Sequence, residues 1–331
     1  MTSLQHPVRW SAELDGWVVA RRVDALTVMR DPETFTVDDP RFSTARVVGP
    51  SMLSLEGDEH ARHRAPFARR FRRDAILRDL GDVVVAEADA LVARFDGVVD
   101  LRTAYAGPLA ARMMAHVLGI GHTPTEDVLR WYGAIVQATV DASEGREPGP
   151  EGAAAFAELA AAMDLRVDGL SPAEAASNAG VLLFGGIETT EGMILNAVWH
   201  LLGHGEPVAD LRGAVEESLR LEPAAAVVDR YATRDVGPGI RAGDKVVVSI
   251  RDANRDPDAF PDPDRFDPGR ENAGRHLAFA AGPHVCLGMH LARLEAHTAL
   301  GRLPPLELVE ATAPEGRVFR KPGVLHVRVS G

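Results

Sequence analysis

The chain has 331 residues, of which 46% are hydrophobic and 25% charged, so it can bury the core of one large domain or of two ordinary ones. Its net charge of −12 argues against general nucleic-acid binding, and its single cysteine excludes an internal disulfide and any multi-cysteine metal site. The apolar runs are shorter than the roughly 20 residues that cross a bilayer, and the first residues lack a signal-peptide pattern, so we expect a cytoplasmic protein that does not enter a membrane.

The first fifty residues are expected to form a small lobe of strand and helix. Residues 17–20 have a β pattern, and an amphipathic stretch over residues 23–29 stops before Pro32. From about residue 59 to 169 the apolar residues recur every three or four positions, which is typical of helices. The Ala- and Glu-rich run 151–162 is predicted to be an ordered helix, because its residues are strong helix formers.

The clearest single element is a long helix that begins after Ser171. Ser171-Pro172-Ala173-Glu174 is a capping box with proline at the first helical position, and the apolar pattern continues to about Leu202. This helix is apolar nearly all round, so we expect it to be buried. The chain then continues with a helix, β structure, a Pro- and Asp-rich loop and a last helix, over residues 210–221, 235–249, 256–272 and 288–300.

These elements predict one mainly α-helical domain, residues 1–331, with a minor β lobe. The β-rich lobe is expected over residues 1–50 and 225–250, and the helical lobe over residues 59–222 and 276–300. The sequence contains no internal repeat and no clean linker that would divide it further.

The only cysteine, Cys286, lies in a glycine-punctuated loop just before the last helix. Free backbone N–H groups and the positive end of a helix dipole stabilise a thiolate in such a place, and a thiolate is a strong iron ligand. Gly282 and Gly288 would let a flat cofactor approach the backbone closely. The alternatives are a buried structural cysteine and a hydrolase pair of Cys286 with His284, although residues two apart seldom face each other as nucleophile and base must.

The segment around this cysteine resembles the haem-binding loop of the cytochrome P450 family, Phe-x-x-Gly-x-(His/Arg)-x-Cys-x-Gly. Every fixed position is filled, by Phe279, Gly282, His284, Cys286 and Gly288. The resemblance implies the mainly α cytochrome P450 fold, and a haem b (iron protoporphyrin IX) that these residues contact. It also implies that Cys286 is the thiolate ligand of the haem iron.

The long helix carries a second motif of that family. Its residues 185–190, Gly-Gly-Ile-Glu-Thr-Thr, resemble the oxygen-activation motif (Ala/Gly)-Gly-x-(Asp/Glu)-Thr-Thr. The resemblance implies that Gly186 lies against the cofactor, that Thr189 acts at the oxygen site and that Glu188 relays protons from solvent. The alternative is a helix crossing packed at glycine, with Thr189 bonded back to a carbonyl of its own helix.

A third motif concerns stability rather than chemistry. Glu217-Ser218-Leu219-Arg220 matches the family's Glu-x-x-Arg, and the later Pro-Asp-Arg-Phe segment supplies Arg265. By this resemblance Glu217, Arg220 and Arg265 form a buried structural network that locks the cysteine loop, in which each charge needs a partner. Glu217 and Arg220 by themselves would be an ordinary surface pair.

The two propionates of a haem need cationic or hydrogen-bonding partners. The resemblance assigns this role to four side chains, those of His60, Arg64, Arg230 and His284. Surface histidines are one alternative for the first of these sites, and a metal site formed by the Asp, Glu and His side chains of residues 58–63 is another.

Six arginines are crowded into twelve residues, namely Arg62, Arg64, Arg69, Arg70, Arg72 and Arg73. In the family this helix lies on the face nearest the cysteine, where an acidic ferredoxin docks, and opposite charges would steer its approach. We therefore expect electrons from a separate ferredoxin and ferredoxin reductase, with peroxide as the other source. A solvated arginine-rich helix face is the alternative explanation of the charge run.

The predicted activity is that of a monooxygenase, which inserts one atom of O2 into a small or medium hydrophobic substrate in bacterial specialised metabolism. The rivals are a haem-thiolate peroxygenase that uses hydrogen peroxide, and a non-catalytic haem-binding protein, which would not need Thr189. Only 17 residues separate Phe42 from His60, where the family has a lid over the substrate. This short lid predicts an open pocket that accepts a bulky or carrier-bound substrate.

Overall fold

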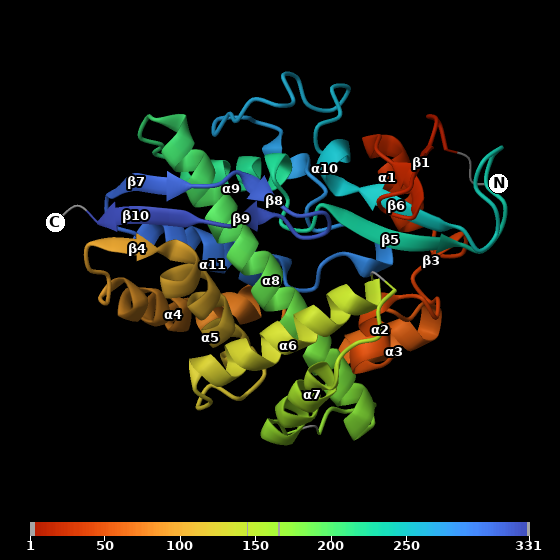
Figure 1. Cartoon of the computed structure of the whole chain (residues 1–331), viewed down its shortest axis with the longest axis horizontal. Helices are drawn as coiled ribbons and strands as arrows, with labels where there is room; N and C mark the ends of the chain where they lie inside the picture. Colours follow the sequence, from red (N-terminus) through yellow and green to blue (C-terminus); the bar gives the residue numbers. More distant parts are fainter. Residues whose placement is uncertain (1–3, 144, 165, 330–331) are drawn as a thin grey trace.

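The computed structural model describes residues 4–143, 145–164 and 166–329. These residues form mainly helices, together with three small sheets, which confirms the expected mainly α architecture with a minor β part. The long helix α8 (Pro172–His204) runs diagonally through the middle of the molecule, and the other elements are arranged around it (Figure 1).

Helix α8 begins where the sequence predicts and is the core of the fold. The Ser171 hydroxyl accepts a hydrogen bond from the Glu174 amide, and the Glu174 carboxylate accepts one from the Ser171 amide, so the capping box is confirmed. Its 33 residues make it about 50 Å long. By length and composition α8 could cross a membrane, but 78% of its most apolar stretch is buried inside the protein, as expected of a core helix.

The other helices come from both halves of the chain, and α5, α6, α9 and α11 all pack on α8. A π-helical turn (Arg102–Ala106) leads into α5. The helix bounds are α1 Arg22–Arg30, α2 Ser43–Val48, α3 Gly57–Ala68, α4 Arg73–Val92, α5 Gly107–Val117, α6 Thr125–Ser143, α7 Pro150–Ala162, α9 Leu211–Leu221, α10 Ile250–Ala253 and α11 Met289–Arg302.

The largest sheet has five strands from two distant parts of the chain, with β2 parallel to β6 and the other neighbours antiparallel. Its order is β1 (Arg9–Ser11), β2 (Gly16–Val19), β6 (Lys245–Ser249), β5 (Val227–Ala232) and β3 (Phe35–Thr36). A three-stranded sheet contains β4 (Val98–Asp100), β10 (Leu325–Val329) and β7 (Leu306–Ala311), and a short hairpin pairs β8 (Pro314–Glu315) with β9 (Lys321–Pro322). Strand β9 lies against α8, so the C-terminal part of the chain reaches the central helix.

Candidate functional site

Cys286 lies in the loop between a 3-10 turn (Gly282–His284) and α11. Its backbone N–H donates a hydrogen bond to the Phe279 carbonyl at 2.8 Å, which closes the loop, and the Gly288 amide donates one to its sulfur. The side chain of Cys286 is exposed, although protein surrounds it at longer range.

The protein's own groups leave this thiol harder to ionise than usual. Burial raises the pKa of Cys286, and the Gly288 amide, Arg64 and Arg293 lower it by less. Of these contributions burial is the largest, so the amide and the two arginines offset it only in part. A bound iron ion would supply the missing positive charge, because a coordinating thiol is deprotonated by its metal.

Gly282 has a role that differs from the one expected. Its φ is +74°, and a Cβ there would lie 2.2 Å from the Met29 carbonyl oxygen at the end of α1. Glycine is thus needed to pack the loop against α1, not to admit a flat cofactor. At Gly288 a Cβ would have only the Cys286 sulfur nearby, at 3.9 Å, so that position is open on the sulfur side.

We expect Gly282→Ala to destabilise the protein by about 3 kcal/mol or more, because it combines left-handed strain with a backbone overlap. The matched control is Gly301→Ala in the last turn of α11, where nothing lies within 4 Å of the added Cβ. That control should change the free energy of unfolding by less than about 1 kcal/mol. Urea unfolding of both variants measures the difference, and equal stabilities would contradict this role.

Helix α8 has one open stripe in its buried middle. From Ala175 to Val198 every residue is buried except Leu182, Gly185, Gly186 and Thr189, which are spaced i, i+3, i+4, i+7 and so share one face. A Cβ added at Gly185 would meet nothing within 4 Å, whereas one at Gly186 would lie 2.2 Å from the Met114 sulfur. Gly185 is therefore the open position, and Gly186 is a close contact with α5 rather than the cofactor contact expected.

The structure places Thr189 and Glu188 on different faces of α8. The Thr189 hydroxyl lies on the open stripe and donates to the Gly185 carbonyl at 2.6 Å. The Glu188 carboxylate is buried and has two partners, the Lys321 ammonium at 2.8 Å and the Tyr132 hydroxyl. The sequence analysis missed Lys321 and Tyr132, which come from distant segments that no spacing rule connects to α8.

Three of the four predicted propionate partners lie close to one another. The rings of His60 and His284 are 4.4 Å apart, burial and the neighbouring His284 and Arg64 lower the pKa of His60, and Arg64 interacts with Cys286. The sequence analysis missed Glu56, which bonds to His284 at 3.1 Å and also interacts with His60 and Arg230. Glu56 thus relates Arg230, the fourth partner, to the two histidines.

This basic group fits a ligand with two carboxylates. Arg230 is 5% exposed, forms no ion pair within the described residues, and has its pKa lowered to about 10 by burial. The buried His60 Nε2 atom has no hydrogen-bond partner there, and burial lowers the pKa of His60 to about 4. An anion at this position would satisfy both groups, as the propionates of a bound haem would do.

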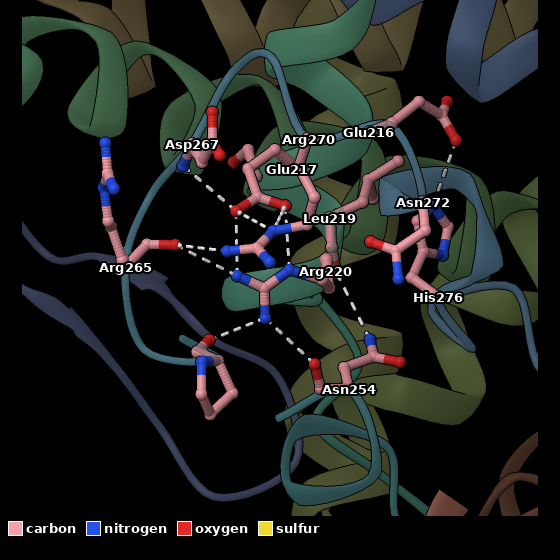
Figure 2. Close-up of polar contacts among 12 residues, drawn as sticks. Glu216, Glu217, Leu219, Arg220, Asn254, Arg265, Asp267, Arg270, Asn272 and His276 are labelled. Atoms are coloured by element: carbon pink, nitrogen blue, oxygen red, sulfur yellow. Dashed lines mark hydrogen bonds and ion pairs between the residues drawn. The ribbon is translucent and has the colours of Figure 1, made fainter. Parts of the chain in front are cut away.

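The buried charge network is centred on Glu217, whose side chain has no exposed surface. Both of its carboxylate oxygens accept from the Arg220 and Arg270 guanidinium groups, and one also accepts from the Asp267 amide (Figure 2). The arginine that completes the network is therefore Arg270, and the expectation for Arg265 is wrong. Figure 2 shows the Arg265 side chain pointing away, while its carbonyl accepts from both guanidinium groups.

Substitution tests this correction directly. Arg270→Ala should destabilise the protein by about 3–5 kcal/mol, because it leaves the buried Glu217 carboxylate with an incomplete set of partners. Arg265→Ala removes an exposed side chain and keeps the carbonyl, so it should cost less than about 0.5 kcal/mol. Denaturant unfolding distinguishes the two, and a larger loss for Arg265 would restore the original assignment.

The alternative metal site near residues 58–63 is not supported. Donor atoms of Glu59, His63 and Glu174 lie within 4.8 Å of one another. However, the Arg62 guanidinium lies between the two carboxylates, at 2.7 Å from Glu59 and 2.5 Å from Glu174. An internal cation thus already balances these acids, and His60 is not a member of the group.

The arginine cluster divides into two parts. Arg62 is paired with acids, and Arg64 donates to the Val285 carbonyl beside the cysteine at 2.7 Å. The other four are exposed at the junction of α3 and α4, namely Arg69, Arg70, Arg72 and Arg73. We call these four the arginine patch. Arg64 connects α3, the helix that precedes the patch, to the cysteine loop.

The short segment between Phe42 and His60 packs against neighbouring helices and does not stand open. Helix α2 packs on α6, α7 and α8, and the loop after it is fastened by a hydrogen bond from the Met52 amide to Asn178 of α8, at 2.8 Å. Asn178 is fully buried and also bonds to His63. This segment therefore gives no support to the open pocket expected from its length.

Comparisons with known proteins point to one family. The model of the family "Cytochrome P450" matches residues 207–303. Cytochrome P450 monooxygenase PikC of Streptomyces venezuelae is 34% identical, over 92% of this chain and 82% of its own, and vitamin D(3) 25-hydroxylase of Pseudonocardia autotrophica is 31% identical, over 90% and 83%. A third relative, nocardicin C N-oxygenase of Nocardia uniformis subsp. tsuyamanensis, is 34% identical over 94% of this chain and 87% of its own.

Solved structures show the same relationship. P450BioI, in complex with an acyl carrier protein ligated to hexadec-9Z-enoic acid, has a TM-score of 0.86 and 29% identity over 98% of this chain and 96% of its own. A mutant of P450 EryK in complex with erythromycin B has a TM-score of 0.83 and 28% identity over 99% and 94%. With its cysteine loop, its basic group and these relatives, the chain belongs to the cytochrome P450 family, whose members carry a haem, and is a P450 monooxygenase.

Proposed function

We propose that this monooxygenase holds a haem b through Cys286 and oxidises a small or medium hydrophobic molecule of bacterial specialised metabolism. The observation that carries the proposal is the basic group near Cys286, in which Arg64 donates to the Val285 carbonyl, the His60 Nε2 atom has no hydrogen-bond partner and the buried Arg230 forms no ion pair within the described residues. When bound, a haem would supply reductive activation of O2. The residues of the chain supply the sulfur ligand, the propionate partners and the hydroxyl at the oxygen site.

Electrons are proposed to come from a separate ferredoxin with its reductase. The arginine patch supports this, because it is exposed and lies on the chain segment that Arg64 ties to the cysteine loop. An acidic ferredoxin docked there would be steered by opposite charge, and the rate would fall as salt concentration rises.

The test compares charge reversal inside and outside the patch. Arg72→Glu with Arg73→Glu should lower ferredoxin-dependent reduction severalfold at low salt and flatten its salt dependence. The control is Arg94→Glu, an exposed arginine just past the far end of α4. Turnover with peroxide alone should be the same in all three proteins. Full activity with peroxide, and none with ferredoxin and reductase, would instead favour a peroxygenase.

The substrate is proposed to be presented either free or on a carrier protein. One observation favours the carrier form, since P450BioI was solved with a fatty-acyl carrier protein and this chain covers 96% of that structure. Spectral titration with free long-chain acids and with the same acids on an acyl carrier protein distinguishes the two. Tighter binding of the free acid would rule out the carrier form for that class.

A further inference from the structure

A second group of charged side chains lies beside α8, away from the cysteine loop. The Lys321 ammonium, on strand β9, bonds to the Glu188 carboxylate at 2.8 Å and to the Glu191 carboxylate at 2.9 Å. Arg102, in the π-helical turn before α5, donates to the same Glu191 oxygen at 3.0 Å. The exposed fractions of the side chains are 8% at Glu188, 5% at Glu191, 13% at Lys321 and 45% at Arg102. Lys321 therefore joins two buried acids while it stays partly exposed itself.

Glu188 is held away from the threonine beside it in the sequence. Consecutive helical residues point about 100° apart, and Glu188 is buried whereas Thr189 is one of the four residues of the stripe, so the two side chains lie on different faces of α8. Each carboxylate oxygen of Glu188 already has a donor, the Lys321 ammonium for one and the Tyr132 hydroxyl for the other. To reach the stripe, the carboxyl must leave at least one of these partners.

Charge balance explains why a cation is needed here. Glu188 and Glu191 are three residues apart on one helix face, and their side chains are 8% and 5% exposed. Two buried carboxylates facing each other repel, and a shared cation compensates for this repulsion. Within the described residues that cation is Lys321, and Arg102 touches only the Glu191 end.

We propose that Lys321 is a positioning and proton-transferring residue that links Glu188 to solvent, while Glu191, which is also paired with Arg102, holds its ammonium in place. This inference rests on the proposed function, because Glu188 would serve Thr189 at the oxygen site. The Lys321 ammonium gives one proton to the Glu188 carboxylate, and the neutral Glu188 carboxyl then releases a proton toward the stripe. The neutral Lys321 amine, which is 13% exposed, takes a proton from solvent, so the group returns to its starting charge.

The two possible roles of Lys321, charge and proton transfer, are separable by substitution. Arginine keeps the positive charge and both hydrogen bonds, but its guanidinium is not deprotonated in proteins. Lys321→Arg should therefore preserve a purely structural role and block a relay. Lys321→Met removes both the positive charge and the transferable proton. The chain offers a matched control, since its only other lysine, Lys245, pairs with Asp229 in the five-stranded sheet.

The expected activity result is a loss confined to O2-dependent turnover. A general acid contributes about 10²–10⁴-fold, and because other protons can reach the stripe we expect product formation to fall roughly tenfold in both Lys321→Arg and Lys321→Met. Hydrogen peroxide released per electron pair should rise, and the rate ratio between H2O and D2O should increase. Peroxide-driven turnover and Lys245→Met should stay within twofold of the natural enzyme.

A readout independent of turnover comes from the low lysine content. With 15N-lysine labelling, the purified holoprotein should show two side-chain ammonium signals, one for each lysine. Glu188→Gln should shift the Lys321 signal and speed its hydrogen exchange with solvent, and should leave the Lys245 signal in place. An unmoved Lys321 signal would show that the Lys321–Glu188 contact does not exist in solution and would overturn the proposal.

Failure of this inference can be told from failure of the proposed function. If the natural enzyme shows no thiolate-type spectrum or no ferredoxin-driven product, the proposed function fails and the lysine result is not reached. If the natural enzyme turns over and Lys321→Arg matches it in rate, coupling and isotope effect, the relay is wrong and Lys321 only balances charge. Loss of turnover with peroxide as well would likewise overturn the relay, because it would indicate a damaged site.

Discussion

Replacement of Cys286 with alanine is expected to abolish monooxygenase turnover and the far-shifted Soret band of the reduced, carbon-monoxide-bound protein. The reason is that the chain has no second cysteine to take over as thiolate ligand. The loop itself should survive the change, since its closing bond runs between the backbone atoms of Cys286 and Phe279. The measurement is the difference spectrum of purified protein, expressed with ample haem precursor.

Cys286→Ser is the matched control for shape. It keeps an acceptor for the Gly288 amide and nearly the same volume, but a serine hydroxyl is a much poorer ligand for haem iron than a thiolate. We expect it to lose the thiolate-type band while it keeps the stability of the natural protein. An intact thiolate-type spectrum in either variant would mean that Cys286 is not the ligand, and the proposed function would fall with it.

Replacement of Glu217 with alanine should produce the largest loss of stability of any single change proposed, about 3–5 kcal/mol or more. The side chain is completely buried and bonds to two guanidinium groups and one amide. Its removal leaves the buried Arg220 charge with only carbonyl partners, and burying an uncompensated charge is costly. Thermal or denaturant unfolding of the holoprotein gives the measurement.

The control for this change is an acid whose ion pair is solvated. Glu307 pairs with Arg328 on the exposed sheet, where the two side chains are 63% and 52% exposed. Glu307→Ala should cost less than about 1 kcal/mol, because surface pairs contribute little. A Glu217 variant that unfolds with the same free energy as the Glu307 variant would show that the network is not essential to the fold.

The long helix and the fold class could be predicted because their signals are local. Ser171 and Glu174, within four residues, mark the start of α8. Its apolar pattern is continuous because the helix is buried on all sides. Residues 235–249 were expected to be β structure with a turn at residues 242–244. The structure has an isolated bridge between Val236 and Ile240 before this turn and the strand Lys245–Ser249 after it.

The sequence could predict where the site lies, but not all of the residues that form it. The cysteine loop and the basic side chains sit in recognisable patterns, and the structure gathers them together. What spacing cannot show is which of two nearby arginines turns inward. Arg265 fits the expected motif, but its position in the loop aims the side chain at solvent, and Arg270, five residues later, reaches Glu217.

The partners of Glu188 were missed for a related reason. Lys321 follows Glu188 by 133 residues and approaches it only because a small C-terminal hairpin packs on α8. Tyr132 reaches it from α6. Contacts of this kind depend on tertiary packing, and a single sequence carries no local signal for them. The same is true of Gly185 and Gly186, whose open and closed sides are set by the neighbouring Met114.

Helix α9 fastens the chain on both sides of the cysteine. Glu217 binds Arg270 upstream of the loop, and the adjacent Glu216 binds Arg293 downstream of it at 2.6 Å. Opening the loop would therefore break one clamp or the other, which makes late insertion of a large, rigid porphyrin slow. We expect the prosthetic group to bind while the chain is being synthesised. Chains produced under iron or porphyrin starvation should therefore bind haem poorly when it is supplied later, unless they are first partly denatured.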